Sequence, residues 1–275
     1  MSKYDVVIIG SGIGGLCCAS LLALAGKKVL ICEAHNKPGG VAHSFTKDGY
    51  KFESGPSLWS GLNNYSTNNP LGQILKLLDE AIEVKHYKGW RVLFPESNFD
   101  LEVGDSPFRK KINELRGENS LREWDAFISE VKPLSKIISK MPLLTTSPTN
   151  LNLIEGINLA RKFLPNIQNA AKLRVGFGKI AEKHLNDPFL LNWVDLLSFL
   201  ISGMPMNDTN TAAMSTLFDE WFQPNSCLDY PVGGSESVVD ALIRGLKKYG
   251  GEIILSSKVK EIAFKNNLAC GVHLE

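Results

Sequence analysis

The stretch from residue 4 to residue 40 constrains the fold of this chain most strongly. Residues 6–9 form a short continuous apolar run, which is typical of a strand buried on both faces of a parallel sheet. Three glycines follow in the spacing G-x-G-x-x-G, at Gly10, Gly12 and Gly15. In a strand–turn–helix setting the first glycine allows a tight turn, and the second allows the backbone to approach a pyrophosphate. The third allows the helix to pack closely on the strand.

The glycines open a helix that the sequence places from Ile13 to Gly26, a residue suited to a left-handed helix cap. Free N–H groups and the positive end of the helix dipole at its start attract phosphate. A second strand, residues 28–32, ends at Glu33, close to the position at which an acid binds the adenosine ribose and repels a 2′-phosphate. This complete context predicts a Rossmann-like dinucleotide site rather than a turn with incidental glycines.

A second glycine pair, Gly39 and Gly40, follows soon after the acid. In nicotinamide-dependent dehydrogenases the second strand usually leads into another helical crossover. Here a second backbone segment can press against a long cofactor, which favours FAD, with NAD in the first βαβ unit as the alternative. Alternating aromatic residues at 50–53 then predict a short strand, which ends in a tight turn at residues 55–56.

Composition and charge exclude several classes of protein. The chain has 30 Lys and Arg residues against 29 Asp and Glu residues, so no overall field favours nucleic acid. The five cysteines show neither metal nor disulfide spacing, and we expect reduced thiols and no metal site. No apolar run of about 18 residues is present, and the first strand begins too close to Met1 to leave room for a leader. We therefore expect a cytoplasmic protein.

The helical middle of the chain contains a basic stretch. Residues 120–123 match a capping box, and Asp187 with Pro188 predicts the start of another helix. Between residues 160 and 185 six basic residues accompany one acid, which indicates either a solvated helix face or a peripheral contact with an anionic, for example photosynthetic, membrane.

The helix that follows is apolar around most of its circumference. Residues 189–201 predict a helix that is deeply buried or lines an apolar cavity. Asp195 lies within this helix and requires a partner if it is buried. It is interpreted either as a paired helix acid or as a catalytic acid.

Beyond these patterns the sequence resembles a known family. The G-x-G-x-x-G, acid and Pro-Gly-Gly series resembles the flavoproteins of the amine oxidase and phytoene desaturase superfamily. Many members have Gly-Gly-Arg after the proline, whereas this chain has Gly-Gly-Val at residues 39–41, and carotenoid isomerases also have a small apolar residue there. The segments that resemble carotenoid isomerases (prolycopene isomerases) extend over the whole chain, at residues 38–45, 49–52, 54–62, 69–71, 187–189, 192–197, 220–221 and 230–234.

The resemblance implies an α/β fold, with an FAD/NAD(P)-binding Rossmann-like parallel sheet domain and an inserted, mainly helical domain. It implies that residues 1–60 and 229–275 form a discontinuous FAD-binding domain and that residues 61–228 form a helical domain that faces substrate and membrane. Carotenoid isomerases have a further large segment, so the chain looks like the N-terminal part of a longer protein. We expect the chain alone to bind FAD poorly and to lack turnover.

The resemblance also implies an activity and a set of cofactor contacts. The activity is FAD-dependent conversion of poly-cis-lycopene to all-trans-lycopene, with reduced FAD as the active form and NAD(P)H as a candidate reductant. The alternatives are a carotene desaturase, a retinol saturase-like oxidoreductase, or a non-catalytic nucleotide-binding fragment. No catalytic side chain can be assigned, and His35 and His43 are interpreted as hydrogen-bonded turn residues. The motifs and the resemblance together predict cofactor contacts at Gly10, Gly12, Ile13, Gly14, Gly15, Glu33, Gly39, Gly40, Ser44, Gly55, Pro56, Ser57 and Val259.

Overall fold

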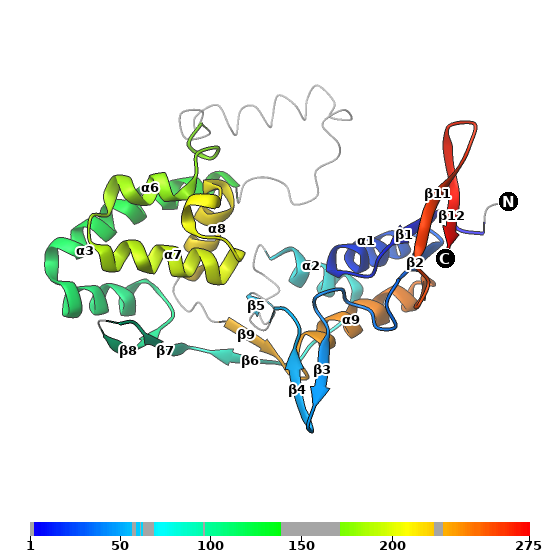
Figure 1. Ribbon diagram of the computed structural model, residues 1–275, viewed down its shortest axis with the longest axis horizontal. Coiled ribbons are helices and arrows are strands. Elements are labelled where there is room, and N and C mark those ends of the chain that lie inside the picture. Colours follow the sequence, from blue (N-terminus) through cyan, green and yellow to red (C-terminus); the bar gives the residue numbers. More distant parts are fainter. Residues whose placement is uncertain are drawn as a thin grey trace. The chain divides into compact units, whose positions relative to one another are not determined.

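The chain divides into two compact units in a computed structural model (Figure 1). Unit 1 consists of residues 1–87 and 228–275, and unit 2 consists of residues 88–227. Unit 2 therefore interrupts unit 1 in the sequence. The structure describes residues 3–56, 59–60, 62, 69–95, 97–138, 171–222 and 228–275.

The first boundary between the units lies later than residue 60, where the sequence analysis placed it. Strand β6 (Val84–Tyr87) pairs antiparallel with β9 (Leu228–Pro231), and β5 (Trp59–Ser60) pairs with the same strand. Because β9 lies at the end of the insertion, this pairing keeps the segment up to Tyr87 in unit 1. Local sequence patterns do not indicate such a pairing, since its partners are more than 100 residues apart.

The centre of unit 1 is a parallel three-stranded sheet in the order β1-β2-β10. Helices α1 and α9 lie side by side against it (Figure 1). Their buried residues, among them Leu16, Val238 and Leu242, share a core with Ile31 of β2. The elements are β1 (Val6–Ile9), α1 (Ile13–Leu24), β2 (Val29–Cys32), α9 (Ser235–Lys248) and β10 (Glu252–Ile254). The predicted Rossmann-like sheet is confirmed.

The burial of β1 differs from the expectation. Val6, Val7 and Ile8 are half-buried and Ile9 is 54% exposed, whereas three of the four residues of β2 are buried. Within the described residues β1 pairs with β2 alone and is an edge strand of its sheet. The expectation that residues 6–9 are buried on both faces is therefore wrong for this structure.

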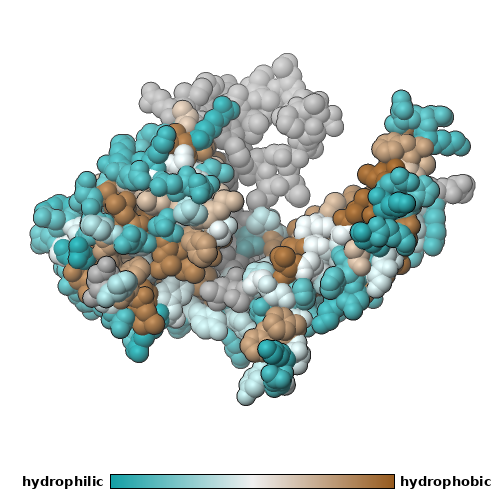
Figure 2. Space-filling view, viewed as in Figure 1, coloured by the Kyte–Doolittle hydropathy of each residue, from teal (hydrophilic) through white to brown (hydrophobic). Residues whose placement is uncertain are grey.

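Unit 1 also contains hairpins and a short helix. The β11–β12 hairpin turns at Asn266 and Asn267, both with positive φ, and exposes Ile262, Phe264 and Leu268 (Figure 2). These elements are β3 (Ser44–Lys47), β4 (Tyr50–Glu53), α2 (Pro70–Leu78), β11 (Val259–Lys265) and β12 (Leu268–Leu274).

Unit 2 is mainly helical, as expected, and encloses an aromatic core. Phe108, Trp124, Phe127, Trp193 and Phe218 are almost fully buried and contact one another in stacked and edge-to-face pairs. Its elements are β7 (Gly89–Leu93), β8 (Asn98–Glu102), α3 (Asp105–Ile138), α6 (Phe177–His184), α7 (Pro188–Ser202), the 3₁₀ helix η3 (Met206–Asp208) and α8 (Thr211–Trp221). In the described part of the chain, no helix combines the length and the apolar character that a membrane crossing requires.

The predicted capping box at residues 120–123 is wrong, although Asp187 caps α7 as expected through a bond from the Phe189 amide (2.9 Å). The Ser120 hydroxyl donates to the Asp187 carboxylate (2.5 Å), and the Glu123 carboxylate accepts from the Asp187 amide (3.0 Å). Both side chains therefore bind the loop before α7 rather than the start of their own helix. The Ser120 hydroxyl and the Glu123 carboxylate, which the local pattern assigned to a helix cap, therefore take part in contacts between distant segments.

Candidate dinucleotide site

The turn between β1 and α1 shows why two of its three glycines are required. Gly10 has a φ of +90°, which only glycine adopts readily. A Cβ atom on Gly15 would overlap with the carbonyl oxygen of Gly10, so the helix can pack against the turn only with glycine at this position. The role of Gly10 in the tight turn and the role of Gly15 in close helix packing both agree with the sequence analysis.

Gly12 has a different reason for being glycine. Its φ of −59° suits any residue, and a Cβ atom there would meet no atom of the protein within 4 Å. Neither backbone conformation nor packing against the described residues therefore requires glycine at this position. The open space beside the amide groups at the start of α1 fits a bound pyrophosphate, which supports the predicted role.

The second glycine pair lies directly against this turn. Gly39 forms a parallel bridge with Gly12, and its φ is +108°. A Cβ atom on Gly39 would lie 2.8 Å from a methyl group of Val239 in α9, and one on Gly40 would lie 3.2 Å from the Cα atom of Gly12. Packing within unit 1 therefore favours glycine at both positions, a reason that the sequence analysis missed. The contact of this pair with FAD stays a prediction.

Glu33 is held by three hydrogen bonds from two neighbouring segments. Its Oε2 atom accepts from the Ser11 amide (2.7 Å) and the Ser11 hydroxyl (2.5 Å), and its Oε1 atom accepts from the His35 amide (2.8 Å). Glu33 is 9% exposed and Ser11 is fully buried. Burial raises the pKa of the Glu33 carboxyl, but the hydrogen bonds from Ser11 and His35 outweigh it and the net shift is downward. The site therefore presents a fixed anionic acceptor.

Backbone hydrogen bonds fix the segments that carry this network. The Gly39 amide donates to the Ser11 carbonyl (3.0 Å), and the Gly10 amide donates to the carbonyl of Cys32 (2.8 Å). After the acid, the Ser257 amide donates to the Glu33 carbonyl (2.7 Å). Residues that are far apart in the sequence thus form one rigid corner at the ends of β1, β2 and β10.

The remaining predicted contacts lie in other parts of unit 1. Ile13 and Gly14 begin α1, and Val259 begins β11. Ser44 donates to Glu53 (3.2 Å), and a Cβ atom on Gly55 would lie 2.5 Å from the Val41 carbonyl oxygen. The carbonyl of Pro56 accepts from the Ser235 hydroxyl. Ser57 lies outside the described residues.

Three residues of these networks were missed by the sequence analysis: Ser11, Glu53 and Ser235. The Glu53 carboxylate accepts from the Ser235 amide at the start of α9 (3.1 Å), and a Cβ atom on Gly234 would overlap with it. Glu53 therefore caps a helix that begins 182 residues later in the sequence. A serine between the two glycines of the turn was a visible signal for Ser11, but nothing local connects Glu53 with α9.

The interpretation of His43 as a turn residue is confirmed. Its Nδ1 atom lies 2.6 Å from the carbonyl oxygen of Gly40, and its Nε2 atom lies 3.0 Å from the Ser54 hydroxyl oxygen. Since a carbonyl can only accept, Nδ1 carries the proton and Nε2 accepts from Ser54 in the neutral ring. His43 thus ties the glycine pair to the end of β4. The described residues contain no cluster of three or more His, Cys, Asp or Glu side chains suited to a metal.

The basic stretch of unit 2 is partly neutralised by a buried acid. Lys172 and Lys183 each lie 2.7 Å from the carboxylate of Glu130, and His184 contacts the same group. Glu130 has a 9% exposed side chain. Burial raises its pKa, but the three donors outweigh burial and lower the pKa to about 2. Lys172 and Lys183 therefore stabilise the fold of unit 2, and they add less cationic charge to its surface than unpaired lysines would.

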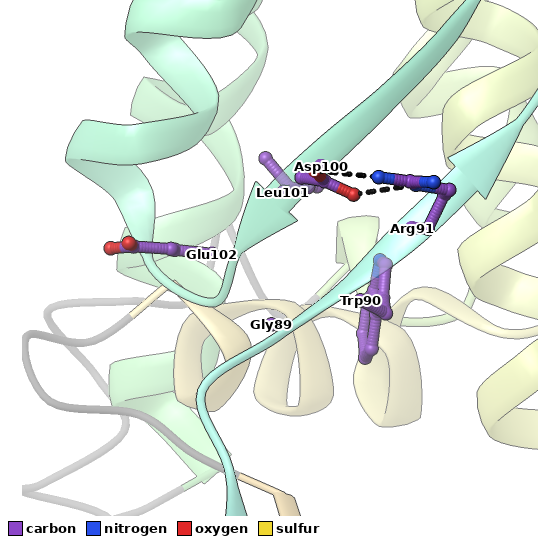
Figure 3. A pocket seen from close by; sticks show the side chains of 6 residues that line it. All are labelled: Gly89, Trp90, Arg91, Asp100, Leu101 and Glu102. Atoms are coloured by element: carbon purple, nitrogen blue, oxygen red, sulfur yellow. Dashed lines mark hydrogen bonds and ion pairs between the residues drawn. The ribbon is translucent and has the colours of Figure 1, made fainter.

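Two other features of unit 2 carry no evident chemistry. Asp195 accepts from the Met206 amide (2.8 Å), which supports its interpretation as a paired helix acid. A shallow hollow on the β7–β8 hairpin is crossed by Arg91 and Asp100, which form a two-bond ion pair at 2.9 and 3.1 Å (Figure 3). Both side chains are about 70% exposed and already satisfy each other. The hollow contains none of the predicted cofactor contacts.

Comparison with known proteins agrees with the geometry. Residues 8–76 match the family described as NAD(P)-binding Rossmann-like domain. The chloroplastic prolycopene isomerase of Arabidopsis thaliana is 30% identical over 289 residues, which cover 99% of this chain and 45% of the relative. The human all-trans-retinol 13,14-reductase is 29% identical over 290 residues, with 99% and 44% coverage. The chain thus spans less than half of the length of these relatives.

Solved structures show the same fold. An oxidoreductase from Methanosarcina mazei aligns over 98% of this chain and 55% of its own, with a TM-score of 0.63 and 17% identity. Putrescine oxidase aligns over 95% of this chain and 53% of its own, with a TM-score of 0.62 and 19% identity. Fold and site together define a dinucleotide-binding protein with a Rossmann-like sheet. More particularly, the chain is similar over 99% of its length to prolycopene isomerases.

Proposed function

We propose that this chain provides the dinucleotide-binding part of an FAD-dependent isomerase that converts poly-cis-lycopene to all-trans-lycopene. The observation that carries the proposal is the corner formed by Ser11, Glu33 and Gly39, which holds an anionic acceptor beside an open phosphate cradle. Similarity to prolycopene isomerases over 99% of the chain supports the choice of substrate.

The residues of the site have separate roles in this proposal. The amide groups at Gly12, Ile13 and Gly14 bind the pyrophosphate, Glu33 binds the adenosine ribose, and the backbone of Val259 contacts the adenine. The rest of the cofactor contacts the second glycine pair and residues that follow it in the sequence: Gly39, Gly40, Ser44, Gly55, Pro56 and Ser57.

A reduced flavin supplies reversible electron or hydride transfer, which lowers the bond order of a conjugated polyene and permits rotation about a cis bond. We propose NAD(P)H as the external reductant. The proposal assigns no catalytic side chain to this chain, whose own part is to bind and orient the cofactor. Collection of the lipid-soluble substrate at a membrane surface belongs to the same proposal, and the apolar face exposed by Phe199 and Leu200 of α7 is compatible with it.

A second candidate function is reduction of a conjugated isoprenoid, favoured by the 29% identity with the human all-trans-retinol 13,14-reductase. Both candidates use the same dinucleotide site, and the described residues show no feature that separates them. The chemistry of the product does separate them, because an isomerase leaves the mass of the polyene unchanged. A saturase adds two hydrogen atoms and a desaturase removes two.

Binding of FAD is the first prediction. We expect titratable binding of FAD, weak because the chain alone is expected to bind FAD poorly, and still weaker binding of FMN, because FMN lacks the adenosine ribose that Glu33 recognises. Glu33→Gln should weaken FAD binding by roughly 10-fold, because the amide provides one acceptor oxygen where the carboxylate provides two. Flavin fluorescence titration measures all three constants. Equal affinity for FMN would contradict the proposed site, and preferential binding of NAD would favour the nicotinamide alternative.

Identification of the product is the second prediction. Because this chain alone is expected to lack turnover, poly-cis-lycopene is incubated with the longer protein that the resemblance implies, FAD and a chemical reductant, under anaerobic conditions in detergent. We expect all-trans-lycopene with unchanged mass, detected by chromatography and mass spectrometry and absent when the protein is omitted. A gain of two hydrogens would support the saturase, and a loss of two the desaturase. No conversion of poly-cis-lycopene, phytoene or all-trans-retinol in the presence of bound FAD would favour a non-catalytic nucleotide-binding role.

A further inference from the structure

The Glu33 carboxylate has few acceptor positions left for a ligand. A carboxylate offers about four lone-pair positions, two on each oxygen. The amide and the hydroxyl of Ser11 occupy both positions on Oε2, at 2.7 and 2.5 Å. The His35 amide occupies one position on Oε1, at 2.8 Å. One position on Oε1 therefore remains for a nucleotide.

A ligand cannot easily displace the donors that fill the other three positions. The Ser11 amide belongs to a turn fixed on both sides, by the Gly10 amide bonded to Cys32 and by the Gly39 amide bonded to the Ser11 carbonyl. The His35 segment is fixed by the Ser256 amide, which donates to the His35 carbonyl at 2.9 Å. Displacement of either amide donor would require movement of this backbone.

The Ser11 hydroxyl is also restrained. Ser11 is fully buried, and its Oγ atom accepts from the Gly39 amide at 3.3 Å while it donates to Glu33. Rotation away from Glu33 would give up both bonds in a place that water does not reach. A hydroxyl bonded to a carboxylate in such a place is among the stronger neutral–charged hydrogen bonds.

We propose that Glu33 accepts a hydrogen bond from only one of the two adenosine ribose hydroxyls, and that Ser11 is the positioning residue that imposes this limit. The inference rests on the proposed dinucleotide function and deepens it. By occupying both acceptor positions of Oε2, Ser11 limits the number of ribose hydroxyls that can donate to Glu33. Without its side chain, one position on Oε2 becomes available and the acid can bind both hydroxyls.

The test measures binding of ADP, 2′-deoxy-ADP and 3′-deoxy-ADP to the chain by isothermal titration calorimetry. For the unmodified chain we expect one deoxy analogue to bind roughly 10-fold more weakly than ADP, and the other to bind within about 2-fold of ADP. For Ser11→Ala we expect both analogues to bind roughly 10-fold more weakly than ADP does to the same variant. The readout is the pattern across three ligands, which a general loss of stability would not change.

Ser20→Ala is the matched control, because Ser20 is another fully buried serine, in the helix α1 that follows the turn, and its hydroxyl donates to the Leu242 carbonyl at 3.0 Å. It should keep the pattern of the unmodified chain. Equal losses for both analogues, or no loss for either, in the unmodified chain would overturn the inference even if Ser11→Ala does not fold. So would an unchanged pattern in folded Ser11→Ala. Absence of ADP binding to the unmodified chain would overturn the proposed function and the inference together, so the two failures are distinguishable.

Discussion

Gly15→Ala is expected to abolish measurable dinucleotide binding and to destabilise unit 1 by about 3 kcal/mol, the upper end of the range for overpacking. The added methyl group would overlap with the carbonyl oxygen of Gly10, and neither group can rotate away, because the carbonyl is part of the backbone and the methyl is bonded directly to the backbone Cα. Helix α1 must then move off the turn, which displaces the amide groups that face the pyrophosphate. A loss of about 3 kcal/mol of binding free energy corresponds to a decrease of roughly 100-fold in FAD affinity.

The control for this substitution is Gly14→Ala, one residue earlier in α1. A Cβ atom on Gly14 would meet nothing within 4 Å, and alanine favours a helix over glycine by about 1 kcal/mol, so unit 1 should be equally or more stable. Hydrogen exchange of α1 and β2 peptides measures unit 1 directly. A Gly15→Ala protein with unchanged exchange and unchanged FAD affinity would contradict the close packing of the helix against the turn.

Glu130→Gln is expected to destabilise unit 2 by about 2 kcal/mol at neutral pH. The substitution removes the charge on which Lys172, Lys183 and His184 converge. The two lysine side chains are 40% and 58% exposed, so solvent screens part of the attraction and the effect falls below that of a fully buried pair. Four of the five tryptophans lie in unit 2, so tryptophan fluorescence during urea unfolding follows this unit.

The same residue predicts a pH dependence with a definite sign. The pKa of Glu130 is lowered from 4.5 to about 2 in the folded state, so the unfolded chain binds the proton more readily. Its contribution is fully present above about pH 4.5 and is lost as the pH falls towards 2. The stability of unit 2 should therefore decrease across this window, and the decrease should be smaller in Glu130→Gln.

Glu118→Gln serves as the matched control for Glu130. The Glu118 side chain is 81% exposed and pairs with Arg122 one helical turn away, so its replacement should change the stability of unit 2 by less than about 0.5 kcal/mol. Equal effects of the two substitutions would show that the buried network is not a source of stability. A steeper acid transition in Glu130→Gln would contradict the direction of the pKa shift.

Much of unit 1 could be predicted from local patterns. The turn at Gly10 and Gly15, the helix that begins at Ile13, the second strand and the acid at Glu33 follow one another within a short stretch, and each has a local signal. The β7–β8 hairpin and helix α7 with its Asp187 cap were predictable for the same reason. In these elements the periodicity, the glycines and the capping residues all favour one structure.

The failures share a different cause. Ser120 and Glu123 formed a correct local capping pattern, yet both bind the loop before α7. Local patterns do not mark residues 228–231 as a strand, yet they form β9 because β5 and β6 supply partners from far away in the sequence. In each case a contact between distant segments competes with the local preference and prevails, since it satisfies polar groups that would otherwise be buried or unpaired.

The sequence by itself predicted a dinucleotide site and the elements that surround it, because glycine spacing and an acid after a strand are local and chemically specific. Only the tertiary structure decided how the acid is presented, since Glu33 meets Ser11 and the Gly39 segment through folding of separate segments. It also showed that packing against the first turn and α9 favours glycine at residues 39 and 40. The physical reason is that hydrogen-bond saturation and steric fit depend on distances between segments, which no local pattern records.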